Sequence, residues 1–235
     1  MAEKITAIIL SAGVGRRMKS NIPKQYLDLC GKPVIAWSIG AFENSRFIDD
    51  IILVAGKDDL NFCKAEIVEK YRFRKVRRIV PGGCERGDSV LCGLRAADAE
   101  TKYVLIHDGA RPLVDEDTIE RAVEGARKYR AAVVGIPAKD TIKVVDREEF
   151  VTSTPARSSL RVIQTPQAFA YDLILKSYEK VIEDGIRITD DAMAAEYAGH
   201  VRVKIVEGDV RNLKITTKED IDTARMLLRE SKCLL

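Results

Sequence analysis

Short apolar runs alternate with amphipathic stretches of helical length along residues 5–136, and this alternation restricts the fold more than any other feature. The apolar runs occupy 5–10, 51–54, 79–80, 104–106 and 132–136, and the helical stretches occupy 34–42, 59–71, 89–97 and 117–129. Short continuous apolar runs are typical of strands buried on both faces of a parallel sheet, with helices as the crossover connections. We therefore predict an α/β fold, with a mostly parallel twisted sheet and helices on both of its faces.

The pattern changes between Pro137 and Pro155. Two short β-prone pieces, 141–145 and 149–152, are joined by a polar turn with no helix between them, which is the pattern of a β-hairpin. We predict that residues 137–157 form an arm that projects from the sheet. Because an isolated hairpin is only marginally stable in water, we expect the arm to pack against the same arm of a second copy, giving a homodimer.

The remainder of the chain continues the same domain. After Pro166 the pattern predicts helices at 171–183 and 191–198, an alternating strand at 201–206, a short piece at 212–215 and a last helix at about 217–229. Thr217 and Asp220 have the spacing of a capping box at the start of that last helix. The chain has no internal repeat, low-complexity segment or long linker, so residues 1–235 are predicted to form a single domain with one arm.

The composition excludes several classes of protein. Of 235 residues 46% are hydrophobic, enough for a sizeable core, and 39 Lys and Arg against 36 Asp and Glu leave a formal charge of only +3. That balance argues against a nucleic-acid or membrane-surface partner. The five cysteines are odd in number and widely spaced, as in a cytoplasmic protein with reduced thiols. We expect a cytoplasmic location, with no signal peptide and no membrane span.

The first predicted strand ends in a turn that contains Gly13 and Gly15. Two glycines allow backbone N–H groups to approach phosphate oxygens, and the cations that follow include Arg17 and Lys24. Met18 stands where the dinucleotide fingerprint has its third glycine, and the chain has no P-loop. The turn suits a di- or triphosphate, although an ordinary strand-to-helix turn with solvated cations explains this segment equally well.

Two further loops follow predicted strands. Asp108 and Arg111 come after the strand at 104–106, at the sheet edge where ligands bind in open α/β folds. Asp108 is placed to hold Mg²⁺ through one oxygen and Arg111 to neutralise an anion, with a loop-closing Asp108 as the alternative. Gly82 and Ser89 belong to a loop that could accept a flat base, but a turn before an N-capped helix explains that loop better.

The two histidines, His107 and His200, have no evident nucleophile partner in the sequence, so a serine or cysteine hydrolase is not expected. Several cations beside a single candidate metal carboxylate fit transfer onto an attacking group that is already anionic. A phosphate monoester is such a group, because its second pKa is about 6 and no proton need be removed before it attacks.

Taken together, the loop motifs closely resemble the 2-C-methyl-D-erythritol 4-phosphate cytidylyltransferase family, in order and spacing, from about residue 5 to residue 225. The motifs are Ala12-Gly13-Val14-Gly15-Arg16-Arg17-Met18 with Pro23-Lys24-Gln25-Tyr26-Leu27, His107-Asp108-Gly109-Ala110-Arg111-Pro112, Thr165-Pro166-Gln167-Ala168-Phe169, Thr189-Asp190-Asp191 and Asn212-Leu213-Lys214-Ile215-Thr216. The first is shared with many nucleotidyltransferases, whereas the combination is specific. The resemblance implies a Rossmann-like nucleotidyltransferase fold and a homodimer joined through the arm.

The resemblance also implies the reaction. CTP and 2-C-methyl-D-erythritol 4-phosphate would give 4-diphosphocytidyl-2-C-methyl-D-erythritol and pyrophosphate, a step of non-mevalonate isoprenoid precursor synthesis. Arg17 and Lys24 match the residues that stabilise the transition state, and Lys214 matches a cation near the reacting phosphates. Asp108 matches the aspartate that binds Mg²⁺ and positions the substrate.

Further residues match the contacts to each substrate. For CTP these are Ala12, Gly13 and Gly15 at the phosphates and Gly82 and Ser89 at the cytosine. For methylerythritol phosphate they are Thr165 with Arg111, together with Thr141 and Arg157 from the arm of the second subunit. We count Arg157 with Arg17, Lys24 and Lys214 as the catalytic residues.

Two other functions are compatible with the sequence. A cytidylyltransferase for another polyol phosphate, such as ribitol 5-phosphate, has similar loops. A CTP-binding module without catalysis is the second possibility, but the presence of Arg17, Lys24, Asp108 and Lys214 together argues against it.

Overall fold

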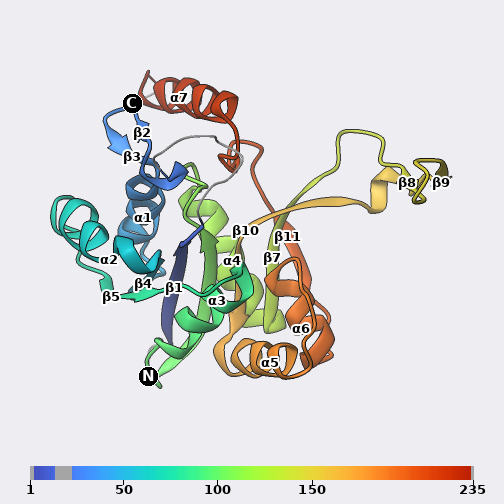
Figure 1. Ribbon diagram of the computed structural model, residues 1–235, viewed down its shortest axis with the longest axis horizontal. Helices are drawn as coiled ribbons and strands as arrows, with labels where there is room; N and C mark the ends of the chain where they lie inside the picture. Colours follow the sequence, from blue (N-terminus) through green and yellow to red (C-terminus); the bar gives the residue numbers. More distant parts are fainter. Residues whose placement is uncertain (1–2, 14–22, 234–235) are drawn as a thin grey trace.

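The computed structural model describes residues 3–13 and 23–233, and its centre is a seven-stranded sheet (Figure 1). The strand order is β11-β7-β10-β6-β1-β4-β5. The strands are β1 (Lys4–Ser11), β4 (Asp50–Ala55), β5 (Val76–Pro81), β6 (Thr101–Asp108), β7 (Ala131–Pro137), β10 (Arg161–Ala170) and β11 (Lys204–Glu207). All are parallel except β10, which is antiparallel to both of its neighbours, β6 and β7. The predicted mostly parallel sheet is confirmed.

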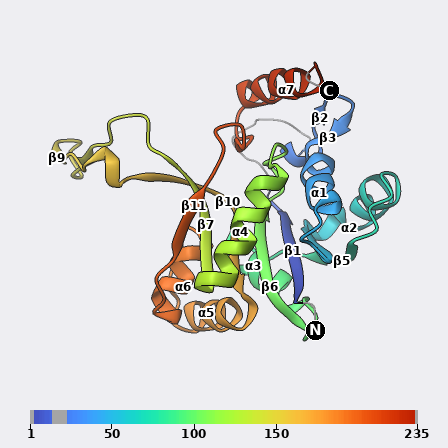
Figure 2. The same cartoon turned by 180° about the vertical axis from the view of Figure 1, so that it is seen from behind.

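Helices cover both faces of the sheet, as predicted (Figures 1 and 2). One face carries α1 (Val34–Asn44), α2 (Leu60–Phe62) and α4 (Glu116–Tyr129), and the other carries α3 (Arg86–Arg95), α5 (Tyr171–Glu183) and α6 (Asp191–Gly199). Successive β-strand side chains point to opposite faces, so Ile9 packs in one core cluster and Ile8 in the other.

Two helical predictions need correction. The helix predicted at 59–71 is not continuous, because a 3₁₀ turn and the short α2 lead into a π-helix at Cys63–Glu69. The helix predicted to begin at Ser89 begins at Arg86, because Glu85 and Asp88 form a capping box there. Asp115 caps α4. The predicted capping box of the last helix is confirmed, since Asp220 accepts a hydrogen bond from the Thr217 N–H at 2.8 Å.

Strand β10 was not predicted. It contains Pro166, which cannot donate to a sheet ladder, and its register with β7 shifts between Ile163 and Gln167. The strand predicted at 201–206 is shorter and begins at Lys204, and the 212–215 piece is not a strand. A small hairpin, β2 (Asp28–Leu29) with β3 (Lys32–Pro33), was also missed.

The predicted hairpin arm is present and projects from the sheet between β7 and β10 (Figure 1). Its strands are shorter than predicted, with β8 at Val144–Val145 paired to β9 at Val151–Ser153. The arm exposes apolar side chains, including Phe150 at 67% and Val151 at 57%.

The last helix, α7 (Lys218–Cys233), packs in a third, smaller core beside the carboxyl ends of the parallel strands. Ile221 and Ala224 of α7 contact a cluster that includes Leu29, Val34 and Ile215. This packing fixes residues 212–216 next to the turn that follows β6, where the Ile215 N–H donates to the Ala110 carbonyl at 2.8 Å. Within the described ranges, no helix is long and apolar enough to cross a membrane.

Gly93 of α3 provides a test of the packing between α3 and the sheet. A Cβ at Gly93 would lie 2.5 Å from Ile8 Cγ2 and 3.0 Å from Val54 Cγ2. We expect Gly93→Ala to lower the free energy of unfolding by about 1–3 kcal/mol in urea titrations, because the core must shift to accept the methyl group. Gly40→Ala in α1 is the matched control, since a Cβ there would meet only Phe73 Cε1 at 3.9 Å. An equal loss of stability in both variants would contradict the packing explanation.

Candidate active site

A cavity of about 470 Å³ lies at the edge where the parallel strands end. Loops that are distant in sequence meet there because the carboxyl ends of parallel strands share one edge of the sheet. The lining residues are Leu10, Ser11, Ala12, Gly13, Lys24, Gln25, Gly83, Cys84, Glu85, Arg86, Ser89, Asp108, Ala110 and Lys214. The structure therefore brings together six of the residues that the sequence singled out: Ala12, Gly13, Lys24, Ser89, Asp108 and Lys214.

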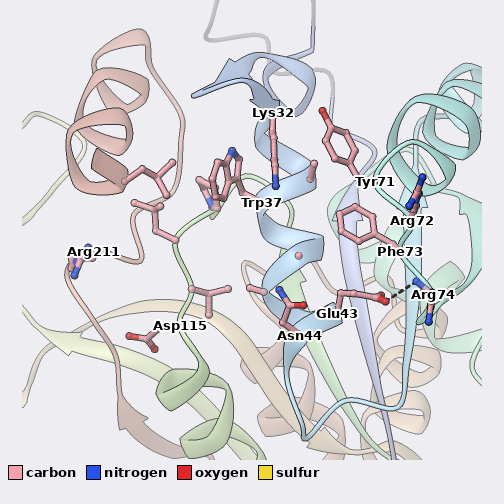
Figure 3. A pocket seen from close by; sticks show the side chains of 17 residues that line it. Lys32, Trp37, Glu43, Asn44, Tyr71, Arg72, Phe73, Arg74, Asp115 and Arg211 are labelled. Atoms are coloured by element: carbon pink, nitrogen blue, oxygen red, sulfur yellow. Dashed lines mark hydrogen bonds between the residues drawn. The ribbon is translucent and has the colours of Figure 1, made fainter. Parts of the chain in front are cut away.

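A larger cavity, of about 660 Å³, lies on the outer side of α1 and is lined by Lys32, Trp37 and Tyr71 among others (Figure 3). It contains none of the predicted site residues. Its two carboxylates already have local partners: Glu43 accepts hydrogen bonds from the backbone N–H groups of residues 74 and 75, and Asp115 caps α4. We assign the candidate site to the smaller cavity.

Asp108, the last residue of β6, is the centre of charge in this cavity. Its Oδ2 lies 2.7 Å from Lys214 Nζ, its Oδ1 lies 3.4 Å from Arg86 Nε, and Arg111 Nε lies 3.8 Å from Oδ2. Burial by itself would raise the pKa of Asp108, but Arg86 and Lys214 hold it well below its ordinary value. Asp108 is therefore ionised throughout the physiological pH range.

Lys24 reaches the same region from the 3₁₀ turn at Lys24–Tyr26. Its Nζ donates to the Ile215 carbonyl at 2.9 Å, which places it beside the segment that carries Lys214. Gln25, which the sequence reasoning did not single out, donates to the Ser11 carbonyl at 2.8 Å and fixes this turn against the end of β1. Two lysine ammonium groups are thus held near one cavity.

The loop after β5 fits the alternative that the sequence favoured for it. Ser89 Oγ donates to the Glu85 carbonyl at 3.1 Å and accepts from the Gly83 N–H at 3.1 Å, so it closes its own loop while lining the cavity. Gly82 lies against the first turn, where a Cβ would be 2.4 Å from the Ala12 Cβ. Only glycine permits this approach of the two loops.

Arg111 and Thr165 lie beside Asp108 in a buried network. Thr165 Oγ1 accepts from the Asp108 N–H at 3.0 Å, and the Asn212 side chain donates to the Thr165 carbonyl at 2.8 Å. Arg111, which is 9% exposed, donates from one terminal nitrogen to the Asn212 carbonyl at 2.7 Å. Within the described part of the chain, the buried Arg111 Nε has no hydrogen-bond acceptor.

Two features of the site were missed from the sequence. Asp191 is fully buried, and its carboxylate accepts two hydrogen bonds from Arg86, at 2.7 and 2.8 Å, and one from the Tyr178 hydroxyl. The neighbouring Asp190 caps α6 and accepts a hydrogen bond from the Met193 N–H. His107 is also fully buried, and burial lowers its pKa to about 4. The Arg86 partner of Asp191 and the Thr165 partner of His107 lie 105 and 58 residues away in the sequence, so no local pattern indicates these two contacts.

Among the described residues, five predicted residues do not line the cavity: Gly82, Arg111 and Thr165, which contact residues that line it, and Thr141 and Arg157 of the arm. Thr141 and Arg157 belong to the exposed arm, and Arg157 donates to the Lys139 carbonyl at 2.9 Å. Neither lines the cavity of its own chain, because the arm extends away from the sheet (Figure 1). Gly15 and Arg17 lie outside the described residues.

A magnesium ion is compatible with the donor set at Asp108. Among residues 3–13 and 23–233, no group of three or more His, Cys, Asp or Glu side chains is placed to hold a metal. A single carboxylate suffices for Mg²⁺ when substrate phosphates and water supply its remaining ligands. Asp108, an ionised carboxylate in a cavity with two lysines, fits that requirement.

The sheet edge, the glycine turn and the cations around one carboxylate define a nucleotidyltransferase. The family model described as IspD, 2-C-methyl-D-erythritol 4-phosphate cytidylyltransferase, matches residues 5–230. The enzyme of that name from Clostridium acetobutylicum is 47% identical over 225 residues, covering 96% of this chain and 97% of the relative. That from Lachnoclostridium phytofermentans is 45% identical over 229 residues, covering 97% of each.

Solved structures agree with the sequence relatives. The 4-diphosphocytidyl-2C-methyl-D-erythritol synthase from Anaerococcus prevotii superposes with a TM-score of 0.86 at 36% identity, covering 97% of this chain and 99% of that one. The corresponding cytidylyltransferase from Francisella tularensis gives a TM-score of 0.80 at 28% identity, covering 95% and 99%. The chain therefore belongs to the 2-C-methyl-D-erythritol 4-phosphate cytidylyltransferase family.

The buried His107 predicts how stability depends on pH. Its pKa is about 4 in the folded protein and about 6.5 in an unfolded chain, so between these values the unfolded state binds more protons. The free energy of unfolding should therefore fall as pH is lowered through this window, by about 3 kcal/mol from this group. Urea titrations across the window should show a shallower pH dependence for His107→Gln, which cannot titrate. The same slope in both proteins would show that His107 is not a buried neutral group.

Proposed function

We propose that the chain transfers the cytidylyl group of CTP to the phosphate of 2-C-methyl-D-erythritol 4-phosphate. The products are pyrophosphate and 4-diphosphocytidyl-2-C-methyl-D-erythritol, and the step belongs to non-mevalonate isoprenoid precursor synthesis. The observation that carries the proposal is the meeting of Lys24, Lys214 and Asp108 at one cavity, in a chain of this family. Family membership indicates the reaction. The geometry supports it, because two cations and a carboxylate lie together where the phosphates would react.

CTP would lie across the carboxyl ends of β1 and β5. The turn at Ala12 and Gly13, with Gly15 and Arg17 beyond it, would receive the triphosphate. The loop that contains Gly82 and Ser89 would receive the cytosine, and its tight packing against Ala12 keeps the base and phosphate subsites at a fixed separation.

The chemical step is an in-line attack by the phosphate monoester on the α-phosphorus of CTP. Negative charge spreads over the equatorial and bridging oxygens as the bond to pyrophosphate breaks. Lys24 and Lys214, with Arg17, would stabilise that charge more strongly in the transition state than in bound CTP, and this difference accelerates the reaction. No general base is required, because the attacking phosphate is already anionic.

Asp108 would hold Mg²⁺ through a carboxylate oxygen, and the ion would neutralise phosphate charge when bound. Other residues near Asp108 would bind and orient the acceptor substrate. Arg111 and Thr165, beside Asp108, would bind the methylerythritol phosphate.

The acceptor site would be completed by the arm of a second subunit in a homodimer. Thr141 and Arg157 would reach it from that arm, since neither lines the cavity of its own chain. The exposed apolar side chains of the arm support a buried contact with another copy. A cytoplasmic location is proposed on the spacing of the cysteines, which suits a reducing compartment.

The reaction is tested by pyrophosphate release from CTP with a panel of polyol phosphates. Release with methylerythritol phosphate, and little with ribitol 5-phosphate, is expected. Equal turnover of both acceptors would contradict the assigned specificity, and no release with any acceptor would contradict the assigned activity.

Lys24→Ala tests the role of the ammonium group. We expect kcat to fall about a hundredfold or more, with a smaller change in CTP affinity, because the contact strengthens as charge develops in the transition state. Steady-state kinetics and CTP titrations give the two values. The matched control is Lys57→Ala, which removes an exposed lysine that does not line the cavity. Unchanged turnover in Lys24→Ala would refute the role.

Mixing two impaired variants tests the shared site. Arg157→Ala should chiefly weaken methylerythritol phosphate binding, and Lys24→Ala should chiefly lower turnover. A heterodimer of the two contains one intact site, so subunit exchange should restore about a quarter of the native activity per subunit. Activity that stays at the sum of the separate variants would argue against a contribution from the second arm.

A further inference from the structure

His107 belongs to the buried network around Asp108, and the proposed reaction gives it no task. Its ring is fully buried and lies against Phe42, with ring centroids 4.8 Å apart. Its Nε2 is 3.1 Å from the Arg111 carbonyl oxygen, and its Nδ1 is 3.0 Å from Thr165 Oγ1. Both ring nitrogens therefore contact residues assigned to the acceptor substrate.

The carbonyl determines which ring nitrogen carries the proton. A carbonyl oxygen can only accept, so Nε2 must be the protonated nitrogen that donates to Arg111. A fully buried imidazole is neutral and has a single N–H, because burial disfavours its charged form. Nδ1 is then an acceptor, and the Thr165 hydroxyl must donate its proton to it.

The hydrogen bonds that the Thr165 hydroxyl already makes show which of its positions is still available. A hydroxyl has one proton and two acceptor positions. The proton is directed to His107, and one acceptor position is filled by the Asp108 N–H at 3.0 Å. Among the described residues no other donor contacts this oxygen, so one acceptor position is left.

We propose that His107 is a positioning residue that fixes the Thr165 hydroxyl as a hydrogen-bond acceptor for a hydroxyl of the acceptor polyol. Thr165 then selects for a donor, which a polyol hydroxyl provides and a phosphate oxygen does not. The cation Arg111 in the same network is left to bind the phosphate. The proposal rests on the proposed function, since it assigns Thr165 to the acceptor rather than to CTP.

The assignment of the ring proton can be tested without any substrate. With ¹⁵N-labelled histidine the chain gives signals from only His107 and His200, and His200→Gln identifies those of His107. We expect a protonated Nε2 and an unprotonated Nδ1 near neutral pH. A protonated Nδ1 would overturn the proposal whether or not the protein transfers cytidylyl groups, so this failure is distinguishable from failure of the proposed function.

Two substitutions separate the contacts of the ring. An asparagine amide oxygen can occupy the position of Nδ1, whereas a glutamine amide nitrogen can occupy that of Nε2. We expect His107→Gln to raise KM for methylerythritol phosphate about tenfold with KM for CTP unchanged, because the Thr165 proton loses its acceptor. His107→Asn should restore KM for methylerythritol phosphate most of the way. Equal effects on both substrates in both variants would indicate a structural role only and contradict the proposal.

A double-mutant cycle shows whether His107 acts through Thr165. Thr165→Val removes the hydroxyl and should raise KM for methylerythritol phosphate, while Thr165→Ser should keep it near the native value. In the Thr165→Val background, His107→Gln should have no further effect on that KM. Additive effects would show that His107 acts by another route and would overturn the proposal. His200→Gln, at an exposed position, is the control for any histidine substitution.

Discussion

The carboxylate of Asp108 is the group on which the candidate site depends, because cations from three separate segments meet there. Lys214 arrives from the chain before α7, Arg86 from the start of α3 and Arg111 from the turn after β6. A nearly buried carboxylate without partners would cost several kcal/mol, so these contacts serve folding as well as function. In the proposed reaction the same contacts would hold the cations in place before a phosphate arrives, which would reduce the reorganisation that the reaction needs.

One buried side chain in the third core places both lysines. Ile215 packs with residues of α1 and α7, its N–H donates to the Ala110 carbonyl, and its own carbonyl accepts from Lys24. Lys214 is its immediate neighbour in the chain. The position of the two ammonium groups is therefore set by hydrophobic packing at the C-terminal helix, outside the main sheet.

The sequence predicts the parallel strands and their helices well, because strands buried on both faces read as continuous apolar runs. It does not predict β10, where Pro166 and the polar Thr165 interrupt the run at the site itself. The sequence also predicts which loops form the candidate site, because the carboxyl ends of parallel strands lie at the same edge of the sheet. The contacts of His107 with Thr165 and of Arg86 with Asp191 join residues that are 58 and 105 positions apart in the sequence. The residue types alone do not show which of them will pair, so the sequence does not predict these contacts.

The arm leaves the sheet at Pro137 and returns at Arg161, and these two residues face each other in the β7–β10 ladder. The two ends of the arm are therefore adjacent, and the register between β7 and β10 does not depend on how many residues the arm contains. Insertions or deletions in the arm should be tolerated by the domain as those in a surface loop are. The length and sequence of the arm are then free to diverge during evolution while the sheet stays constant.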